Sequence, residues 1–380
     1  MTEYKHDGIY SGLLQRASSR ESSAALSLGR GKKRSLISGT RPAPIKMEHH
    51  KPHPAAAFEG YYQKFHFPSG ANLVIVICQV AKAKTKPYKL SVTYVPMDTS
   101  KIWQKELFPE AMEMKTTGNG HDFTLDVPGI GHAKWTGDDV TEYEMKHESF
   151  SFRATTSKRM PWSKDTVTPE GLLVNLPLPL HWHVQSFAST ANCELQLQDY
   201  DLPPSDAKAE VTVHQEKNWA FSFPSAHMWV CAREGERGLC LAGGEILGME
   251  AFLLGYRSSD LNLDFRPPFA VRFAGVSPFM SYTTKWEDRS FALSIQSFRQ
   301  KIEVKAKAPK GSFFSLSPPF PEGHRENYLG QSFQATVEIK IYESGWFGAW
   351  EVVKEDVFEN AGLEFGAGYY PPAGTKEKFN

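Results

Sequence analysis

The sequence predicts an all-β protein with two antiparallel β domains, each of them a barrel or a sandwich. Many short segments alternate apolar and polar residues and end at turns, and residues 58–65 and 333–341 are clear examples. Helical periodicity is nearly absent, and only residues 102–114 fit either a short helix or an edge strand. Aromatic residues form 13% of the chain, which suits strands and apolar cavities. Such barrels could hold an apolar cavity in one mouth or between them.

The first predicted domain covers residues 51–200. Turns at Pro68-Ser69-Gly70 and Gly118-Asn119-Gly120 separate alternating segments. We expect its strands at residues 58–65, 72–80, 90–94, 123–127, 150–152, 181–184 and 193–197. Residues 201–206, which contain two prolines, are expected to link the two halves.

The second predicted domain covers residues 207–365. We expect its strands at residues 211–213, 228–231, 239–241, 251–256, 261–265, 271–273, 291–295, 302–304, 333–341 and 346–353. Residues 366–380 are rich in Gly and Pro and are expected to form a flexible tail.

Residues 1–50 are predicted to be a disordered tail. They are rich in Ser, Arg, Lys and Gly and show no apolar periodicity, so they cannot bury enough surface to offset their ordering entropy. A Ser- and Arg-rich start fits a transit peptide, but acids such as Glu3, Asp7 and Glu21 argue against it. No secretory signal opens the chain, and the longest apolar run, 73–80, is too short to cross a bilayer. A cytoplasmic location is expected, with a plastid or another organelle left open.

The charge balance and the cysteine content limit the classes of binding partner and the compartment that the sequence supports. Lys and Arg together number 43, as do Asp and Glu, so nothing points to nucleic acid or to an anionic membrane surface. Peripheral membrane contact stays open. The four cysteines show no Cys-x-x-Cys spacing, which favours a reducing compartment, although Cys231 and Cys240 could face each other across a hairpin.

The block Glu216-Lys217-Asn218-Trp219 is the strongest candidate for chemistry. On a strand, Glu216 and Asn218 would point to one face, and Lys217 and Trp219 to the other. Aromatic neighbours lower the local dielectric and raise a carboxyl pKa, as protonation of an apolar substrate requires. The alternative is an ion pair at the end of a strand.

Five motifs in order resemble the tocopherol cyclase family. They are Phe58-Glu59-Gly60-Tyr61-Tyr62, His181-Trp182, Glu216-Lys217-Asn218-Trp219, Leu241-Ala242-Gly243-Gly244 and Trp346-Phe347-Gly348-x-Trp350. Tyr61 stands where that family has Trp, and Ala220 where it has Gly. These departures leave the inference about the fold intact, but they argue against tocopherol precursors as the substrate.

The resemblance implies a lipocalin-like fold in two domains and a cyclisation without a cofactor. In the family, an acid protonates a prenyl double bond and a phenol oxygen closes the ring on the resulting cation. This needs a proton donor, a dry pocket and aromatic faces. Two rivals remain open: a pericyclase or hydratase of secondary metabolism in the same superfamily, and a non-catalytic carrier of an apolar ligand.

The candidate acids are Glu216 and Glu59, each of which could instead serve in an ion pair or bond strand backbone. The expected partner is a hydrophobic small molecule. Residues that could bind it, or pack the core, are Tyr61, Tyr62, His181, Trp182, His183, Asn218, Trp219, Trp229, Trp346 and Trp350.

No metal or other cofactor is expected. His181 and His183 would project to one face of a strand, but no third ligand is placed by the sequence. Gly-x-Ser-x-Gly is absent, and no Gly-rich phosphate loop stands out.

Overall fold

Strands make up nearly all of the regular structure. The computed structural model describes residues 50–117, 121–163, 166–221, 223–345 and 348–372. Its only helical elements in these ranges are η1 (Thr99–Lys101), η2 (Gly171–Asn175) and α1 (Pro204–Ala207), which confirms the all-β prediction. None of the described helices is long and apolar enough to span a bilayer. Apart from His50, the expected tail 1–50 lies outside the described residues, as does the turn at 118–120.

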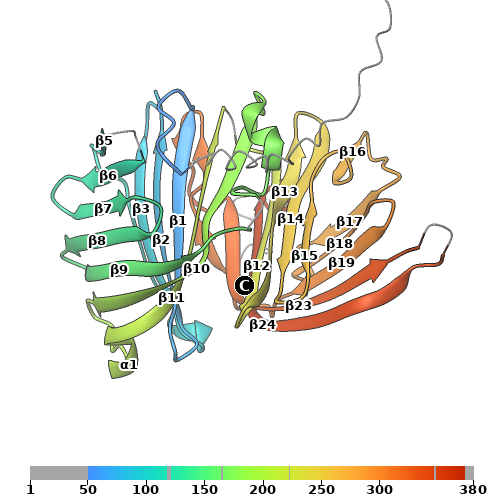
Figure 1. The fold of residues 1–380 in the computed structure, drawn as a ribbon. Coiled ribbons are helices and arrows are strands. Elements are labelled where there is room, and N and C mark those ends of the chain that lie inside the picture. The colour runs from blue at the N-terminus through green and yellow to red at the C-terminus, as the bar shows by residue number, and fades with distance from the viewer. Residues whose placement is uncertain (1–49, 118–120, 164–165, 222, 346–347, 373–380) are drawn as a thin grey trace, which may run out of the picture. The chain divides into compact units, whose positions relative to one another are not determined.

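The first sheet contains the strands from β1 to β11, in the order β4-β3-β2-β1-β11-β10-β9-β8-β7-β6-β5 (Figure 1). Their bounds are β1 (Phe58–His66), β2 (Asn72–Val80), β3 (Tyr88–Val95), β4 (Trp103–Leu107), β5 (Glu113–Thr117), β6 (Asp122–Val127), β7 (Gly131–Thr136), β8 (Val140–His147), β9 (Phe150–Met160), β10 (Leu180–Leu197) and β11 (Lys208–Ala220). Residues 102–114 therefore contribute edge strands rather than a helix.

The first sheet curls around a core of its own. Strands such as β6 and β8 bury every second residue, as the alternating pattern predicts. Phe65 on β1 packs against Tyr143 on β8 and Phe152 on β9, with ring centres 5.4 and 5.0 Å apart. The pairing of β10 with β11 shifts register near Ser186, and such irregularities bend a long strand.

The second sheet contains the remaining long strands, in the order β15-β14-β13-β12-β24-β23-β19-β18-β17, with β16 on β14 and β20 on β23. Their bounds are β12 (Ala226–Glu234), β13 (Arg237–Ile246), β14 (Met249–Arg257), β15 (Asn262–Phe265), β16 (Val271–Phe273), β17 (Met280–Lys285), β18 (Ser290–Gln296), β19 (Gln300–Lys307), β20 (Phe314–Leu316), β23 (Leu329–Glu343) and β24 (Glu351–Ala367). A separate pair joins β21 (Pro319–Phe320) to β22 (Gly323–His324).

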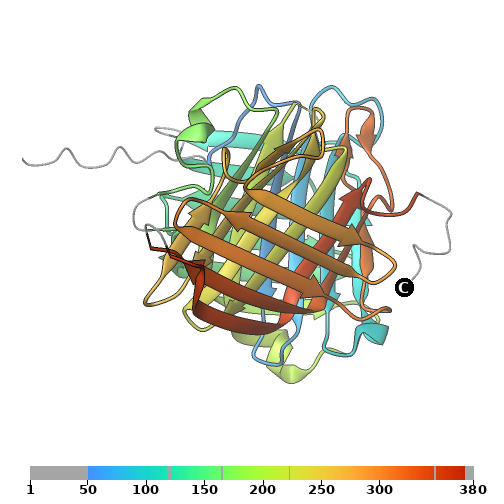
Figure 2. The ribbon, with the colours of Figure 1, turned by 90° about the vertical axis from the view of Figure 1, so that its right-hand side faces the viewer.

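This sheet also folds over on itself. Figure 2 shows its late strands, in orange and red, crossing in front of its earlier, yellow ones. Phe252 on β14 packs against Tyr282 on β17 and Phe291 on β18, with ring centres 5.2 and 5.8 Å apart. Tyr370, which falls in the expected flexible tail 366–380, is buried in this core; residues 373–380 lie outside the described ranges.

The chain changes sheet later than the expected linker at 201–206. Strand β11 pairs with β1 and β10 in the first sheet, so the passage to the second sheet falls between Ala220 and Ala226. Asp206 is fully buried and accepts hydrogen bonds from Tyr94 Oη and Ser69 Oγ, both at 2.7 Å. The predicted division into domains at residues 51–200 and 207–365 stays a prediction. Strand β11, which falls in the second predicted domain, pairs within the first sheet.

The two sheets meet along β1 and β11 on one side and β12 on the other. The ring of Tyr62 on β1 lies 5.4 Å from that of Trp229 on β12, and Lys64 Nζ lies 4.7 Å from the ring centre of Phe333 on β23. Even-numbered residues of β1 and β11 face this seam, while odd-numbered ones face the first sheet's own core.

Candidate active site

A pocket lies at one end of the seam, and several of the predicted site residues line it. Its walls include Tyr62, Trp182, Glu216, Asn218 and Trp229, which the sequence singles out, together with His227 and Glu364. Tyr61 and Lys217 also border it, but their side chains extend to the opposite face of their strands. These residues come from both sheets, on β1, β10, β11, β12 and β24. We call it the inter-sheet pocket.

Glu216 is paired with a histidine that the sequence did not indicate. Glu216 Oε2 lies 2.9 Å from His214 Nε2, two residues earlier on the same face of β11, and both side chains are buried. Burial lowers the pKa of His214, but Cys231 nearby and the hydrogen bond and charge of Glu216 outweigh it, so this pKa is raised. The pair therefore favours a protonated imidazole more than a free histidine does.

A second carboxyl–imidazole pair lies on the wall formed by the other sheet. Glu364 Oε1 lies 3.0 Å from His227 Nε2, and Glu364 Oε2 accepts a hydrogen bond of 2.9 Å from Gln331 Nε2. Gln331 Nε2 also donates to Tyr62 Oη at 3.2 Å. The pocket thus has a carboxylate on each wall, each bonded to an imidazole of its own sheet.

Tyr62 lies between these two carboxylates and keeps its proton. Burial, together with the charges of Glu364 and Glu216, raises the pKa of its phenol well above its usual value. Its hydroxyl oxygen accepts a hydrogen bond from Gln331 Nε2, and its proton has no acceptor among the described residues. Tyr62 can therefore donate a hydrogen bond to a ligand.

Two indoles add further donors. Trp182 and Trp229 are buried, line the pocket, and their Nε1–H groups have no hydrogen-bond partner within the described part of the chain. A buried donor without a partner costs free energy, so such groups are expected to be satisfied by a ligand or by water. The indole faces also offer negative potential to a cation.

The pocket is narrow in this state. Its cavity volume is about 100 Å³, whereas sites for drug-sized ligands hold roughly 300 Å³ or more. Phe223, on the segment between β11 and β12, forms part of the wall and is not held by strand pairing. A long substrate therefore requires side chains of this wall to turn aside.

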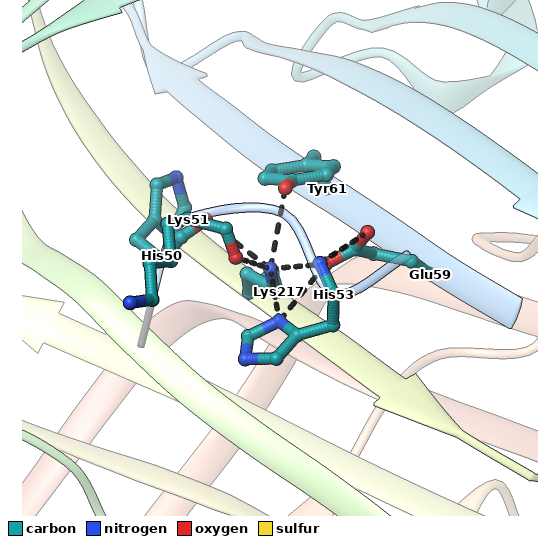
Figure 3. A network of polar contacts seen from close by, with 6 residues as sticks. All are labelled: His50, Lys51, His53, Glu59, Tyr61 and Lys217. Atoms are coloured by element: carbon teal, nitrogen blue, oxygen red, sulfur yellow. Dashed lines mark hydrogen bonds and ion pairs between the residues drawn. The ribbon is translucent and has the colours of Figure 1, made fainter. Parts of the chain in front are cut away.

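The remaining predicted residues cluster on the opposite face of β11, around Lys217. Figure 3 shows its buried Nζ between Glu59 Oε1, Tyr61 Oη at 3.2 Å and His53 Nδ1 at 3.0 Å. The backbone oxygens of His50 and Lys51 also accept from Nζ, at 3.1 and 2.7 Å. This network ties the segment before β1 into the first sheet.

Glu59 is poorly suited to act as an acid. Burial raises its pKa, but the charge of Lys217 and the hydrogen bonds from His53 and Lys217 outweigh burial, so the pKa of Glu59 is lowered. The group is ionised at neutral pH and therefore has no proton to donate. Its alternative reading, an ion pair, is the one the contacts support.

His181 and His183 do not converge on a metal position. Trp219 is stacked between His53 and His181, with ring centres 4.0 and 4.9 Å away. His181 Nδ1 bonds Glu170 Oε2 at 2.8 Å, while His183 Nε2 lies 3.2 Å from Gln185 Oε1. Trp219 and both histidines thus belong to the first sheet's packing. Trp350 lies just before β24, outside the pocket wall, and Trp346 lies outside the described residues.

Three other residues, His214, Cys231 and Cys240, bring side chains that can ligate a metal close together. Cys231 and Cys240 face each other across the β12–β13 hairpin, as the sequence suggests, with sulfurs 3.7 Å apart. His214 joins them, so that three ligand atoms lie within 4.8 Å of one another in the described chain. However, the cations Lys64 and Arg233 lie beside Cys231, which disfavours a divalent cation there.

Sequence reasoning missed His214, His227, Gln331 and Glu364. His214 and Glu216 occupy alternate positions of one strand, a signal that could have been read. Glu364 lies on β24, which extends beyond the predicted strand 346–353, and its pairing with His227 depends on the order of strands in the sheet.

Comparisons with known proteins identify the fold. No protein-family model matches the chain, and no curated protein matches its sequence. The crystal structure of CghA with Sch210972 matches with a TM-score of 0.53 at 11% identity, covering 82% of this chain and 88% of that one. CghA without that compound gives 0.51 at 11% identity, over 82% and 89%. Kievitone hydratase from Nectria haematococca gives 0.49 at 10% identity, over 83% and 90%. The chain thus has the lipocalin-like, two-sheet fold that it shares with CghA.

Proposed function

We propose that this protein is a cofactor-free enzyme that cyclises a prenylated phenol, a quinol or a polyene lipid in the inter-sheet pocket. The observation that carries the proposal is that Glu216, in the wall of an aromatic pocket with Trp182 and Trp229, is hydrogen-bonded to His214, whose pKa is raised. A proton donor in a dry aromatic site is what tocopherol cyclase-type chemistry requires.

In the proposed reaction one carboxyl–imidazole pair donates a proton and the other accepts one. The Glu216–His214 pair gives a proton to one carbon of the prenyl double bond, and the indoles of Trp182 and Trp229 stabilise the tertiary cation. The phenol oxygen bonds to that cation while its proton passes to the Glu364–His227 pair on the other wall. One C–H and one C–O bond form, and one O–H bond and one π bond break, so the product is an isomer of the substrate. Proton exchange with solvent then returns both pairs to their starting protonation states.

The fold is compatible with a bound small molecule. CghA has been crystallised with Sch210972, and this supports the view that two sheets of this kind can hold such a compound between or within them. The same support extends to a second candidate, a pericyclase or hydratase, which depends more on shape and hydrogen bonds. The donors of Tyr62, Trp182 and Trp229, which have no acceptor among the described residues, favour that candidate.

The test uses a prenylated hydroquinone and a matched analogue whose prenyl double bond nearest the ring is saturated. We expect the protein to convert the first to an isomer of equal mass and longer or shorter retention, and to leave the second unchanged. Binding of both compounds without any product would contradict catalysis and leave a carrier. A product that keeps its phenol and gains the mass of water would indicate a hydratase.

A further inference from the structure

The other end of the seam holds a second, larger pocket. Its cavity volume is about 670 Å³, within the range of small-molecule sites. The same three strands supply its polar wall, through Lys64 and His66 of β1, His214 of β11, and Cys231 and Arg233 of β12. Its residues alternate along β1 and β12 in continuation of those of the inter-sheet pocket. We call it the cationic pocket.

Two cations in this pocket lack a carboxylate partner in the described part of the chain. Neither Lys64 nor Arg233 makes an ion pair or a hydrogen bond with any residue in the described ranges, and Arg233 Nε is buried without an acceptor. Lys64 has only the ring of Phe333, 4.7 Å from its Nζ. Cations that are withdrawn from water are normally paired, because desolvating a charge is costly.

The acids around the pocket are engaged elsewhere. Glu234 pairs with Arg237, and Glu359 accepts a hydrogen bond from Thr336 Oγ1 at 2.7 Å. Glu216, which lies next to the pocket, is bonded to His214 of the pocket wall.

Cys231 is a further acidic group in the wall. The thiol of Cys240 donates to its sulfur, and this, with the charges of His214 and Lys64, lowers the pKa of Cys231 to about 6. The basic side chains of Lys64, Arg233 and His214 thus lie together on the seam wall, while the carboxylates of Glu234 and Glu359 are engaged by Arg237 and Thr336. Consistent with this, burial and the charge of Lys64 lower the pKa of His66.

Apolar side chains complete the pocket. Phe187 is buried at its wall, while Met97 and Val357 are 47% and 53% exposed at its rim. A ligand that matches this wall has an anionic group at one end and a hydrocarbon chain at the other.

We propose that the cationic pocket binds an amphiphilic acid, with its oxyanion head between Lys64 and Arg233 and its hydrocarbon chain against Phe187, Met97 and Val357. The guanidinium and ammonium groups suit either a carboxylate or a phosphate head, because both present oxygens to charged donors. This ligand occupies a different place from the substrate of the proposed cyclisation, and its binding does not depend on that reaction.

Calorimetric titration in phosphate-free buffer tests the proposal with four probes: decanoate, decyl phosphate, acetate and decanol. We expect decanoate or decyl phosphate to bind, and the comparison of the two assigns the head group. Acetate and decanol, which carry only the head or only the chain, are expected to bind at least tenfold more weakly. Decanol that binds as tightly as both anionic amphiphiles would overturn the proposal.

Variants locate the site. Lys64→Met and Arg233→Met are each expected to weaken binding by about ten- to a hundredfold, as for the loss of a charge-assisted hydrogen bond. Lys340→Met is the control, because Lys340 is exposed on β23 and pairs with Glu355. Unchanged affinity in both pocket variants would place the ligand elsewhere and overturn the proposal.

Thermal unfolding gives a second readout that does not depend on calorimetry. Because Lys64 and Arg233 have no partner to lose, both variants are expected to keep or raise the melting temperature of the free protein. Decanoate should raise the melting temperature of the wild type but not that of either variant. A free-protein melting temperature that falls by many degrees in both variants would show that these cations are already paired, against the proposal.

Discussion

Replacing Glu216 by Gln tests the proton donor with little change in shape. Gln keeps the size of Glu and can still accept a hydrogen bond from His214 Nε2, which lies 2.9 Å from the carboxylate. It cannot transfer a proton, and it removes the negative charge that helps to raise the pKa of His214. The pair therefore loses both its transferable proton and its preference for holding one.

The expected loss of turnover follows from the rate enhancement that a general acid usually provides. Such groups contribute roughly 100- to 10,000-fold in rate, or about 3–5 kcal/mol of barrier. We expect Glu216→Gln to lower the turnover of a prenylated hydroquinone by that factor, while its dissociation constant changes little because the aromatic walls remain. Glu210→Gln is the matched control, since Glu210 is exposed on the same strand. Turnover within threefold of the wild type, in a variant of normal melting temperature, would refute the role of Glu216.

Three further outcomes are expected. Glu59→Gln should lower the free energy of unfolding by about 3–5 kcal/mol, because it removes the carboxylate that pairs with the buried ammonium of Lys217. The folded pKa of Glu59 is lowered from 4.5, so this stabilisation is present above that pH and is lost as the pH falls through the folded pKa. Urea unfolding at a series of pH values should therefore show wild type and variant converging as the pH falls below 4.5 and through the folded pKa, and a constant difference would contradict the ion pair. Deletion of residues 1–49 should leave the melting temperature unchanged, whereas deletion of 1–53 should lower it by removing two carbonyl acceptors of Lys217; equal melting temperatures would count against the network. Elemental analysis should find no stoichiometric zinc, because Lys64 and Arg233 lie beside Cys231; one zinc per chain would contradict this.

The strand pattern was readable because burial alternates along the chain. Glu216 and Asn218 face the seam, while Lys217 and Trp219 face the first sheet's core, as period-two alternation predicts. The facing pair Cys231 and Cys240 was visible for the same reason, since a hairpin places residues at fixed offsets.

Other features depend on the order of strands, which local pattern does not encode. Strand β11 follows a proline-rich segment that looks like a linker, yet it pairs with β1 at the centre of the first sheet. The role of Glu59 could not be separated from that of Glu216, because its partner Lys217 is 158 residues away. His50 also lies in a stretch without apolar periodicity, but it is buried against Tyr61 and Trp135.

The source of the proton in the product tests the central claim most directly. The protein is incubated with a prenylated hydroquinone in D₂O, and the cyclised product is examined by mass spectrometry and NMR. Protonation of the double bond by the Glu216–His214 pair, whose proton exchanges with solvent, predicts one deuterium on carbon at the former alkene position. A cyclised product without carbon-bound deuterium would contradict acid catalysis and favour a pericyclic reaction, and recovery of unchanged substrate would contradict catalysis altogether.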